Sequence, residues 1–248
     1  MKKILVVVDM QNDFIDGPLG TPEARAIVDN VCAKIREGEW DEIITTQDTH
    51  DEMYLKKQEG KYLPIKHCQE GTEGWNLHHK IFSKLINRYF WTDTFKNTFG
   101  SLSLVNHLRV DLEKHPELTD ADYELTLIGV CTDICVISNA LLLKAHYPEM
   151  KIVVDAACCA GTTPEKHRMA LEVMKSCQVE VENYYEDYVS KEGNDLGKKM
   201  DALNENKCEF NQEACDRKYF SSCVIDANCI DTCNMKCPYE AQIRESED

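Results

Sequence analysis

The chain has 248 residues, of which 43% are hydrophobic and 29% charged, and its formal net charge is −16. This length can bury one good core with a small appendage, and the composition is ordinary for a globular protein. The acidity and the lack of a Lys/Arg cluster argue against nucleic-acid and anionic-membrane partners, because both attract a basic surface. No apolar run approaches the ~20 residues of a membrane helix, and the short run before Asp9 lacks a cleavage site. We therefore expect a soluble, cytoplasmic protein.

Apolar strands alternate with segments of helical period through the first 180 residues. The predicted elements, in chain order, are a strand at 4–8, a helix at 22–36, a strand at 42–46, a short strand at 89–91, a helix at 101–113, a strand at 124–130, a helix at 133–146, a strand at 151–154, a helix at 165–176 and a strand at 179–181. Residues 48–74 are polar and predicted to be a long loop, which is usually functional. The alternation favours a three-layer α/β/α fold with a doubly wound, mainly parallel sheet.

The composition changes after residue 183. We predict a catalytic domain at residues 1–183 and a C-terminal extension at residues 184–248 that is rich in cysteine from residue 208. The six cysteines of the extension are Cys208, Cys215, Cys223, Cys229, Cys233 and Cys237. Three interpretations stay open for them: a metal-stabilised appendage, a disulfide-stapled one, or free thiols. His78 and His79 are predicted to lie at the surface and are given no role.

One segment has the features of a nucleophile turn. In GVCTDICV (residues 129–136) a predicted strand ends and a helix begins, so Cys135 lies in the first helical turn. The positive end of a helix dipole favours a thiolate, and the free N–H groups there can hold an oxyanion. Asp9 and Asp48 also follow predicted strands. Because the carboxyl ends of parallel strands meet at one edge of a sheet, these residues are expected to converge.

Three segments together resemble the signature segments of the isochorismatase-like cysteine hydrolases. They are VDMQNDF (residues 8–14), FKNTF (95–99) and GVCTDICV, in the order and approximate spacing of the family, and the resemblance covers about residues 1–183. It implies Asp9, Lys96 and Cys135 as the catalytic triad. It also implies a non-proline cis peptide near Val130–Cys131 that helps to form the oxyanion hole. Relatives commonly self-associate, so the resemblance also implies a homo-oligomer.

A second group of residues is suited to a metal. Asp48 and His50 alternate on an extended segment and point the same way, and His67 precedes a Gly-Thr pair. This pattern resembles the nicotinamidase branch of the family, in which such residues bind a metal that holds a pyridine nitrogen. Many members have a second His after the pair. Here Lys56 and Lys57 stand nearby, and Glu59 is the candidate for the fourth ligand, with Asp51, Glu52 or a water as alternatives.

The resemblance implies a nicotinamidase that hydrolyses nicotinamide through a cysteine thioester. A mixed N/O ligand set suits one divalent metal, Zn(II) first and Mn(II) or Fe(II) next, and no organic cofactor is expected. The alternatives are another small amide or N-carbamoyl substrate, and an interaction protein on an inactive hydrolase fold. Phe14 and Trp91 are candidates for stacking on a flat substrate ring, although each could equally belong to the core. The Asp48–His67 loop could also use its side chains only for turn hydrogen bonds.

Overall fold

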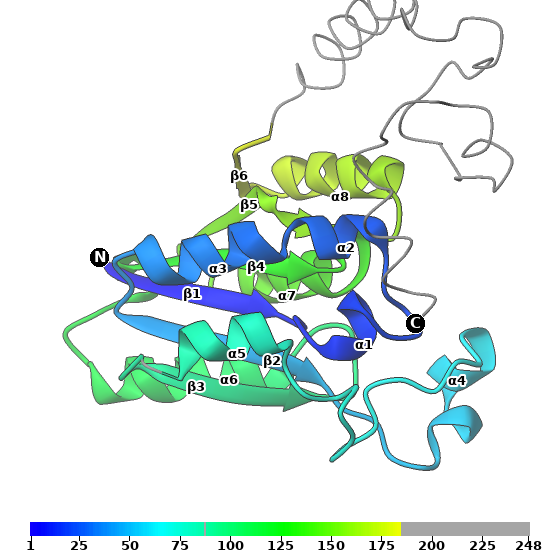
Figure 1. Ribbon diagram of the computed structural model, residues 1–248. Helices are drawn as coiled ribbons and strands as arrows, with labels where there is room; N and C mark the ends of the chain where they lie inside the picture. The colour runs from blue at the N-terminus through cyan, green and yellow to red at the C-terminus, as the bar shows by residue number, and fades with distance from the viewer. Residues whose placement is uncertain (87, 185–248) are drawn as a thin grey trace, which may run out of the picture. The chain divides into compact units, whose positions relative to one another are not determined.

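One parallel sheet forms the centre of the molecule in the computed structural model, which describes residues 1–86 and 88–184 (Figure 1). Its strands are β1 (Lys2–Val8), β2 (Glu42–Asp48), β3 (Trp91–Lys96), β4 (Tyr123–Val130), β5 (Lys151–Ala160) and β6 (Glu180–Glu182). They are arranged in the order β3-β2-β1-β4-β5-β6, and every pairing is parallel. The order reverses between β1 and β4, and such a switch point is where doubly wound sheets bind ligands.

Helices cover both faces of the sheet, which confirms the predicted three-layer fold (Figure 1). The covering helices are α1 (Asn12–Ile15), α2 (Pro22–Ala26), α3 (Val28–Glu37), α5 (His79–Leu85), α6 (Leu102–Lys114), α7 (Ile137–His146) and α8 (Pro164–Ser176), whereas α4 (Gln58–Tyr62) lies in the segment between β2 and α5. Alternate residues of β1 face opposite sides, as the two-residue period of a strand requires. Ile4 and Val6 pack with α6, α7 and α8, whereas Leu5 and Val7 pack with α3 and α5.

The structure differs from the predicted elements at several points. The predicted helix at 22–36 is interrupted at Ile27, between α2 and α3. The predicted strand at 89–91 is wrong, because β3 begins at Trp91 and continues to Lys96. Residues 48–74 contain a short 3-10 turn and α4. His78 was placed at the surface, but it is buried, with Nε2 3.3 Å from Asp16 Oδ2.

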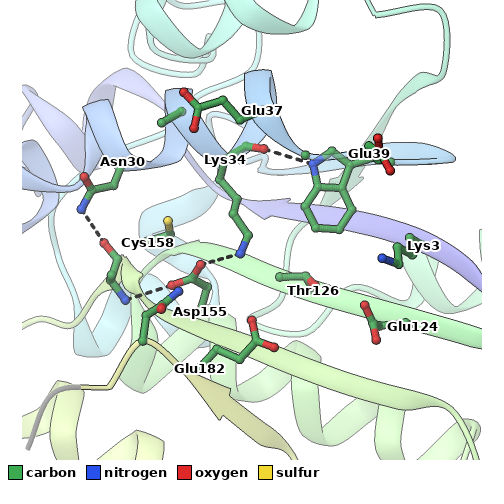
Figure 2. Close-up of a pocket in the computed structure, with 15 residues that line it drawn as sticks. Lys3, Asn30, Lys34, Glu37, Glu39, Glu124, Thr126, Asp155, Cys158 and Glu182 are labelled. Carbon is green, nitrogen blue, oxygen red and sulfur yellow. Dashed lines mark hydrogen bonds and ion pairs between the residues drawn. The ribbon is translucent and has the colours of Figure 1, made fainter.

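A polar hollow of about 580 Å³ lies between α3 and the strands β4 and β5 (Figure 2). Its floor carries the buried carboxylate of Asp155, which Lys34 reaches from α3 at 2.7 Å. Asn30 donates from the same helix to the carbonyl of Ala157 at 2.9 Å. These contacts tie α3 to β5, and none of the candidate site residues lines the hollow.

None of the helices in the described ranges combines the length and apolar character of a membrane span. The cysteines of the predicted extension, Cys208 to Cys237, lie outside the described residues.

Candidate active site

Three side chains meet at the carboxyl edge of the sheet. Asp9 follows β1, Lys96 ends β3, and Cys135 lies in the turn after β4. Lys96 Nζ lies 2.7 Å from Asp9 Oδ2 and 3.6 Å from Cys135 Sγ. Asp9 is completely buried, and the Lys96 side chain is 2% exposed. The structure therefore brings together the three residues that the family resemblance implies as a catalytic triad, and they are called the triad below.

The backbone of Asp9 has an uncommon conformation. Its φ angle is +49°, in the left-handed region that non-glycine residues rarely adopt. Two hydrogen bonds hold it against β2: Asp9 N donates to the Thr46 carbonyl at 3.0 Å, and Thr46 Oγ1 donates to Asp9 Oδ1 at 2.6 Å. Backbone strain of this kind persists only where the surroundings enforce it. The bond from Thr46 leaves the second carboxylate oxygen of Asp9 to face Lys96.

Cys135 lies in a widened helical turn, a π-turn at Thr132–Val136, rather than in the regular helix predicted from residue 133. Val136 N donates to Cys131 O, and Ile137 N donates to Thr132 O, so each of these bonds spans five residues. Single π-turns inside helices occur frequently at functional sites. The peptide bond between Val130 and Cys131 is cis, at the position that the family resemblance implies.

The environment of the triad raises the pKa of the Cys135 thiol. Burial, followed by the Asp9 carboxylate, raises the pKa of Cys135 well above its usual value, although Lys96 acts in the opposite direction. Burial also raises the pKa of Asp9, against the attraction of Lys96. The ammonium of Lys96 thus favours the thiolate, whereas burial and the Asp9 carboxylate favour the thiol. A buried carboxylate whose pKa is raised holds a proton more readily, so Asp9 is suited to take the thiol proton.

Beside the triad, Asp48, His50, Glu59 and His67 form a four-residue cluster whose ligand atoms all lie within 4.8 Å of one another. His50 Nε2 lies 2.8 Å from Asp48 Oδ2 yet makes no hydrogen bond. His67 Nδ1 lies 2.8 Å from the Ile65 carbonyl, which can only accept, so Nδ1 carries the proton. The lone pair of neutral His67 is therefore on Nε2, which faces Asp48 at 3.3 Å.

The charges of this region fit a divalent cation. Asp48 and Glu59 place two carboxylates in the cluster, and burial, followed by the negative charge of Asp48, raises the pKa of Glu59. Buried charges need compensation, and one divalent ion would supply it. Two imidazoles and two carboxylates are ligands that Zn(II) accepts and that also suit Mn(II) and Fe(II). The residues present therefore fit a metal, with Glu59 rather than Asp51 or Glu52 in the cluster.

Two residues that support the cluster were not singled out from the sequence. Gln11 is completely buried, donates to the carbonyl of Asp48 at 2.9 Å and accepts from its N–H at 2.7 Å. Asp13 accepts from the N–H of Cys68, next to His67, at 2.7 Å. Both belong to the VDMQNDF segment, so their place in a signature segment was the signal available. No periodicity or spacing in the sequence predicts a contact between residues so far apart in the chain.

The two aromatic candidates differ in position. The ring of Phe14 lies 5.6 Å from the ring of His67, next to the four-residue cluster. Trp91 begins β3, whereas Lys96 ends it, so they are separated by roughly 16 Å at ~3.3 Å per residue. Trp91 also donates to Thr45 and packs against the core, so it does not lie with the triad or the four-residue cluster.

The fold and the site agree with a comparison to protein families. A model described as the isochorismatase domain matches residues 3–184, and the chain belongs to the isochorismatase family. It is an amidohydrolase, an enzyme that hydrolyses amide C–N bonds.

Several relatives carry more specific names. The chain is 30% identical over 182 residues to an isochorismatase family protein from Bacillus subtilis, covering 69% of this chain and 93% of that protein. It is 25% identical to a nicotinamidase/pyrazinamidase from Mycobacterium tuberculosis, covering 72% and 97%. The crystal structure of a nicotinamidase from B. subtilis matches with a TM-score of 0.59 at 28% identity, covering 73% and 99%. An N-carbamoylsarcosine amidase from Thermoplasma acidophilum matches with a TM-score of 0.55 at 25% identity, covering 75% and 99%.

Proposed function

We propose that this amidohydrolase is a nicotinamidase, which converts nicotinamide and water to nicotinate and ammonia. The observation that carries the proposal is the position of Asp48 between the two groups of residues. Its Oδ1 lies 3.5 Å from Lys96 Nζ, while its Oδ2 lies in the four-residue cluster. A site for a ring nitrogen therefore adjoins a site for attack on a carboxamide. The names of the relatives described above support the same substrate.

The triad supplies the covalent chemistry. Asp9 takes the proton from the Cys135 thiol, and the sulfur attacks the carboxamide carbon to form an S–C bond. The C–N bond then breaks, and Asp9 returns the proton to the leaving nitrogen, which departs as ammonia. Asp9 next takes a proton from water, whose oxygen attacks the thioester. The S–C bond breaks to release the carboxylic acid, and Asp9 returns the proton to the sulfur of Cys135, which restores the thiol. Lys96 stays charged throughout, because Asp9, Cys135 and Asp48 raise its pKa although burial opposes this.

The remaining groups position the substrate. The cis peptide at Val130–Cys131 is proposed to aim backbone N–H groups at the carbonyl oxygen as negative charge develops on it. A divalent metal, held by Asp48, His50, Glu59 and His67, would supply Lewis-acid binding of the pyridine nitrogen, and Zn(II) is the first choice. Phe14, beside His67, is proposed to contact the flat ring.

The second candidate is hydrolysis of another small amide, in particular an N-carbamoyl compound. The similarity to an N-carbamoylsarcosine amidase favours it, since that protein shares the fold at an identity close to that of the nicotinamidases. Such a substrate has no ring nitrogen, so it would leave the four-residue cluster without a role in binding the substrate.

Matched substrates separate the two candidates. Nicotinamide and benzamide have the same shape and carboxamide, but benzamide lacks the ring nitrogen. We expect ammonia release from nicotinamide with kcat/KM at least ~10²-fold above that for benzamide, because a site built to bind a polar atom rejects the analogue that lacks it. Equal rates for the two would remove the proposed role of the cluster. Faster release from N-carbamoyl amino acids than from nicotinamide would instead establish the second candidate.

A further inference from the structure

A buried asparagine on α7 connects the nucleophile turn to the segment that follows Lys96. Asn139 is the third residue of α7 and is completely buried. A buried amide is costly unless its polar atoms are hydrogen-bonded, so the contacts of this side chain show what it is held against.

The side chain of Asn139 reaches two different segments. Nδ2 donates to the carbonyl of Cys135 at 2.8 Å and to the carbonyl of Phe99 at 3.3 Å. Oδ1 accepts from the N–H of Ser101 at 2.8 Å. One amide therefore links the backbone of the nucleophile to both sides of Gly100. In regular helices the Asn side chain is unfavourable, so α7 keeps it at a cost in helix propensity.

The segment held by Asn139 is the direct continuation of β3. Four residues separate Lys96 from Ser101, and the Ser101 side chain caps α6 by accepting from Leu104 N. Packing brings the same segment close to α7, since a Cβ added at Gly100 would lie 3.3 Å from the carbonyl of Ser138. Lys96 and Cys135 are thus connected in two ways. One is the sheet, and the other is the Asn139 side chain, which joins the backbone of Cys135 to the segment after β3.

We propose that Asn139 is a positioning residue for the hydrolysis, which holds Cys135 at its observed distance of 3.6 Å from the Lys96 ammonium. This inference rests on the proposed triad chemistry. Asn139 acts through the backbone of Cys135 and of the segment after β3, and it takes no part in bond making. Reactions that depend on the alignment of groups are sensitive to such support, because a misplacement of about 1 Å can cost on the order of 10²-fold in rate.

Two isosteric variants test the bridge. The hydroxyl of Asn139→Thr can donate to the carbonyl four residues earlier, which is Cys135, whereas Asn139→Val has the same shape and no donor. We expect kcat to fall about 10²-fold in Asn139→Val with KM little changed, and to recover about tenfold in Asn139→Thr. Peptide mass spectrometry measures the rate at which iodoacetamide alkylates Cys135. This rate is expected to be highest in the native protein, lower in Asn139→Thr and lowest in Asn139→Val.

A control separates positioning from stability. Leu143→Ala removes a completely buried side chain one turn further along α7, and denaturant unfolding shows whether its loss of stability matches that of Asn139→Val. We expect kcat and the alkylation rate to stay close to those of the native protein in Leu143→Ala. Equal kcat in Asn139→Val and Asn139→Thr, or an equal fall in Leu143→Ala, would overturn the positioning role. Full hydrolase activity in native protein whose Cys135 has been alkylated would instead overturn the triad itself.

Discussion

At the scale of single residues, Lys96 determines whether the buried charges of the site are compensated. Its ammonium lies 2.7 Å from Asp9 and 3.5 Å from Asp48, and its side chain is 2% exposed. Removal of one partner from a buried ion pair leaves an uncompensated charge, which typically costs about 3–5 kcal/mol. Lys96→Met keeps the length of the side chain and is expected to lower the free energy of unfolding by about that amount, measured by denaturant titration.

The double variant Asp9→Asn/Lys96→Met is the control for this prediction. It removes the opposite charge as well, so it is expected to recover part of the lost stability while it stays inactive. A Lys96→Met protein as stable as the native one would show that the ammonium is not the partner that the buried carboxylates need.

At the scale of secondary-structure elements, Gln11 joins the ends of two strands. It follows β1, and its amide brackets the backbone of Asp48 at the end of β2 and donates to Trp75 O at 2.7 Å. Residues that orient metal ligands typically contribute 10–100-fold in affinity, and Gln11→Leu is expected to weaken Zn(II) binding on that order. Titration against a chelator of known affinity measures it.

Gln47 provides a matched control for that variant. Its amide is also buried and also donates to Trp75 O, at 3.1 Å, but it makes no bond to the backbone of Asp48. Gln47→Leu is therefore expected to leave Zn(II) affinity nearly unchanged. The same loss of affinity in both variants would mean that the Trp75 segment, and not the bracket around Asp48, controls the metal ligands.

A pH-dependent contact joins α6 to β2. His107 Nε2 lies 2.7 Å from Glu42 Oε1, and the bond to Glu42 raises the pKa of His107. The folded protein thus binds the proton more tightly than the unfolded chain. The stabilisation is complete below the unfolded pKa of about 6.5 and is lost as pH rises through the higher folded pKa.

His107→Gln tests this contact. The variant is expected to lose more stability at pH 5.5 than at pH 9, by less than about 1 kcal/mol because the pair is partly exposed. The measurement is the free energy of unfolding of both proteins at the two values. A loss of stability that is the same at both pH values, or larger at pH 9, would contradict a stabilising contact between protonated His107 and Glu42.

Elements with a strong apolar period could be predicted from the sequence, whereas β3 and the π-turn could not. Residues 4–8 are a continuous apolar run, and residues 124–130 carry Leu125, Leu127, Ile128 and Val130; both segments are central strands. β3 reads WTDTFK, an edge strand with polar residues and no apolar run, so its extent and the place of Lys96 at its end were missed. The π-turn depends on bonds that span five residues, and no periodicity in ICV distinguishes it from a regular helix.

The candidate site was predictable because its residues follow strands and occur in signature segments. The supporting contacts were not. Asn139 contacts Ser101, which is 38 residues away in sequence, and Gln11 contacts Asp48, which is 37 residues away. A single sequence does not indicate such long-range pairs. The rise in the pKa of Cys135 could not be predicted either, since burial is a property of the whole fold and not of the local sequence.

At the scale of the whole molecule, residues Met1–Tyr184 form one compact unit, and the family model ends at the same residue. We propose that this unit holds the complete hydrolase. A chain that ends at Tyr184 is expected to keep its kcat for nicotinamide within about twofold of the full chain, because the triad, the four-residue cluster and the hydrogen-bond partners described above for them lie within it. A folded but inactive truncated chain would show that residues 185–248 take part in the reaction.

The most direct test of the proposed function is ammonia release from nicotinamide by the full-length protein before chelation, after chelation and after Zn(II) is restored. We predict release that falls on chelation and returns with the metal, and no release in any of the three states when Cys135 is replaced by serine. Undiminished release from the fully chelated protein would contradict the role of Asp48, His50, Glu59 and His67. Undiminished release by Cys135→Ser would contradict the covalent mechanism.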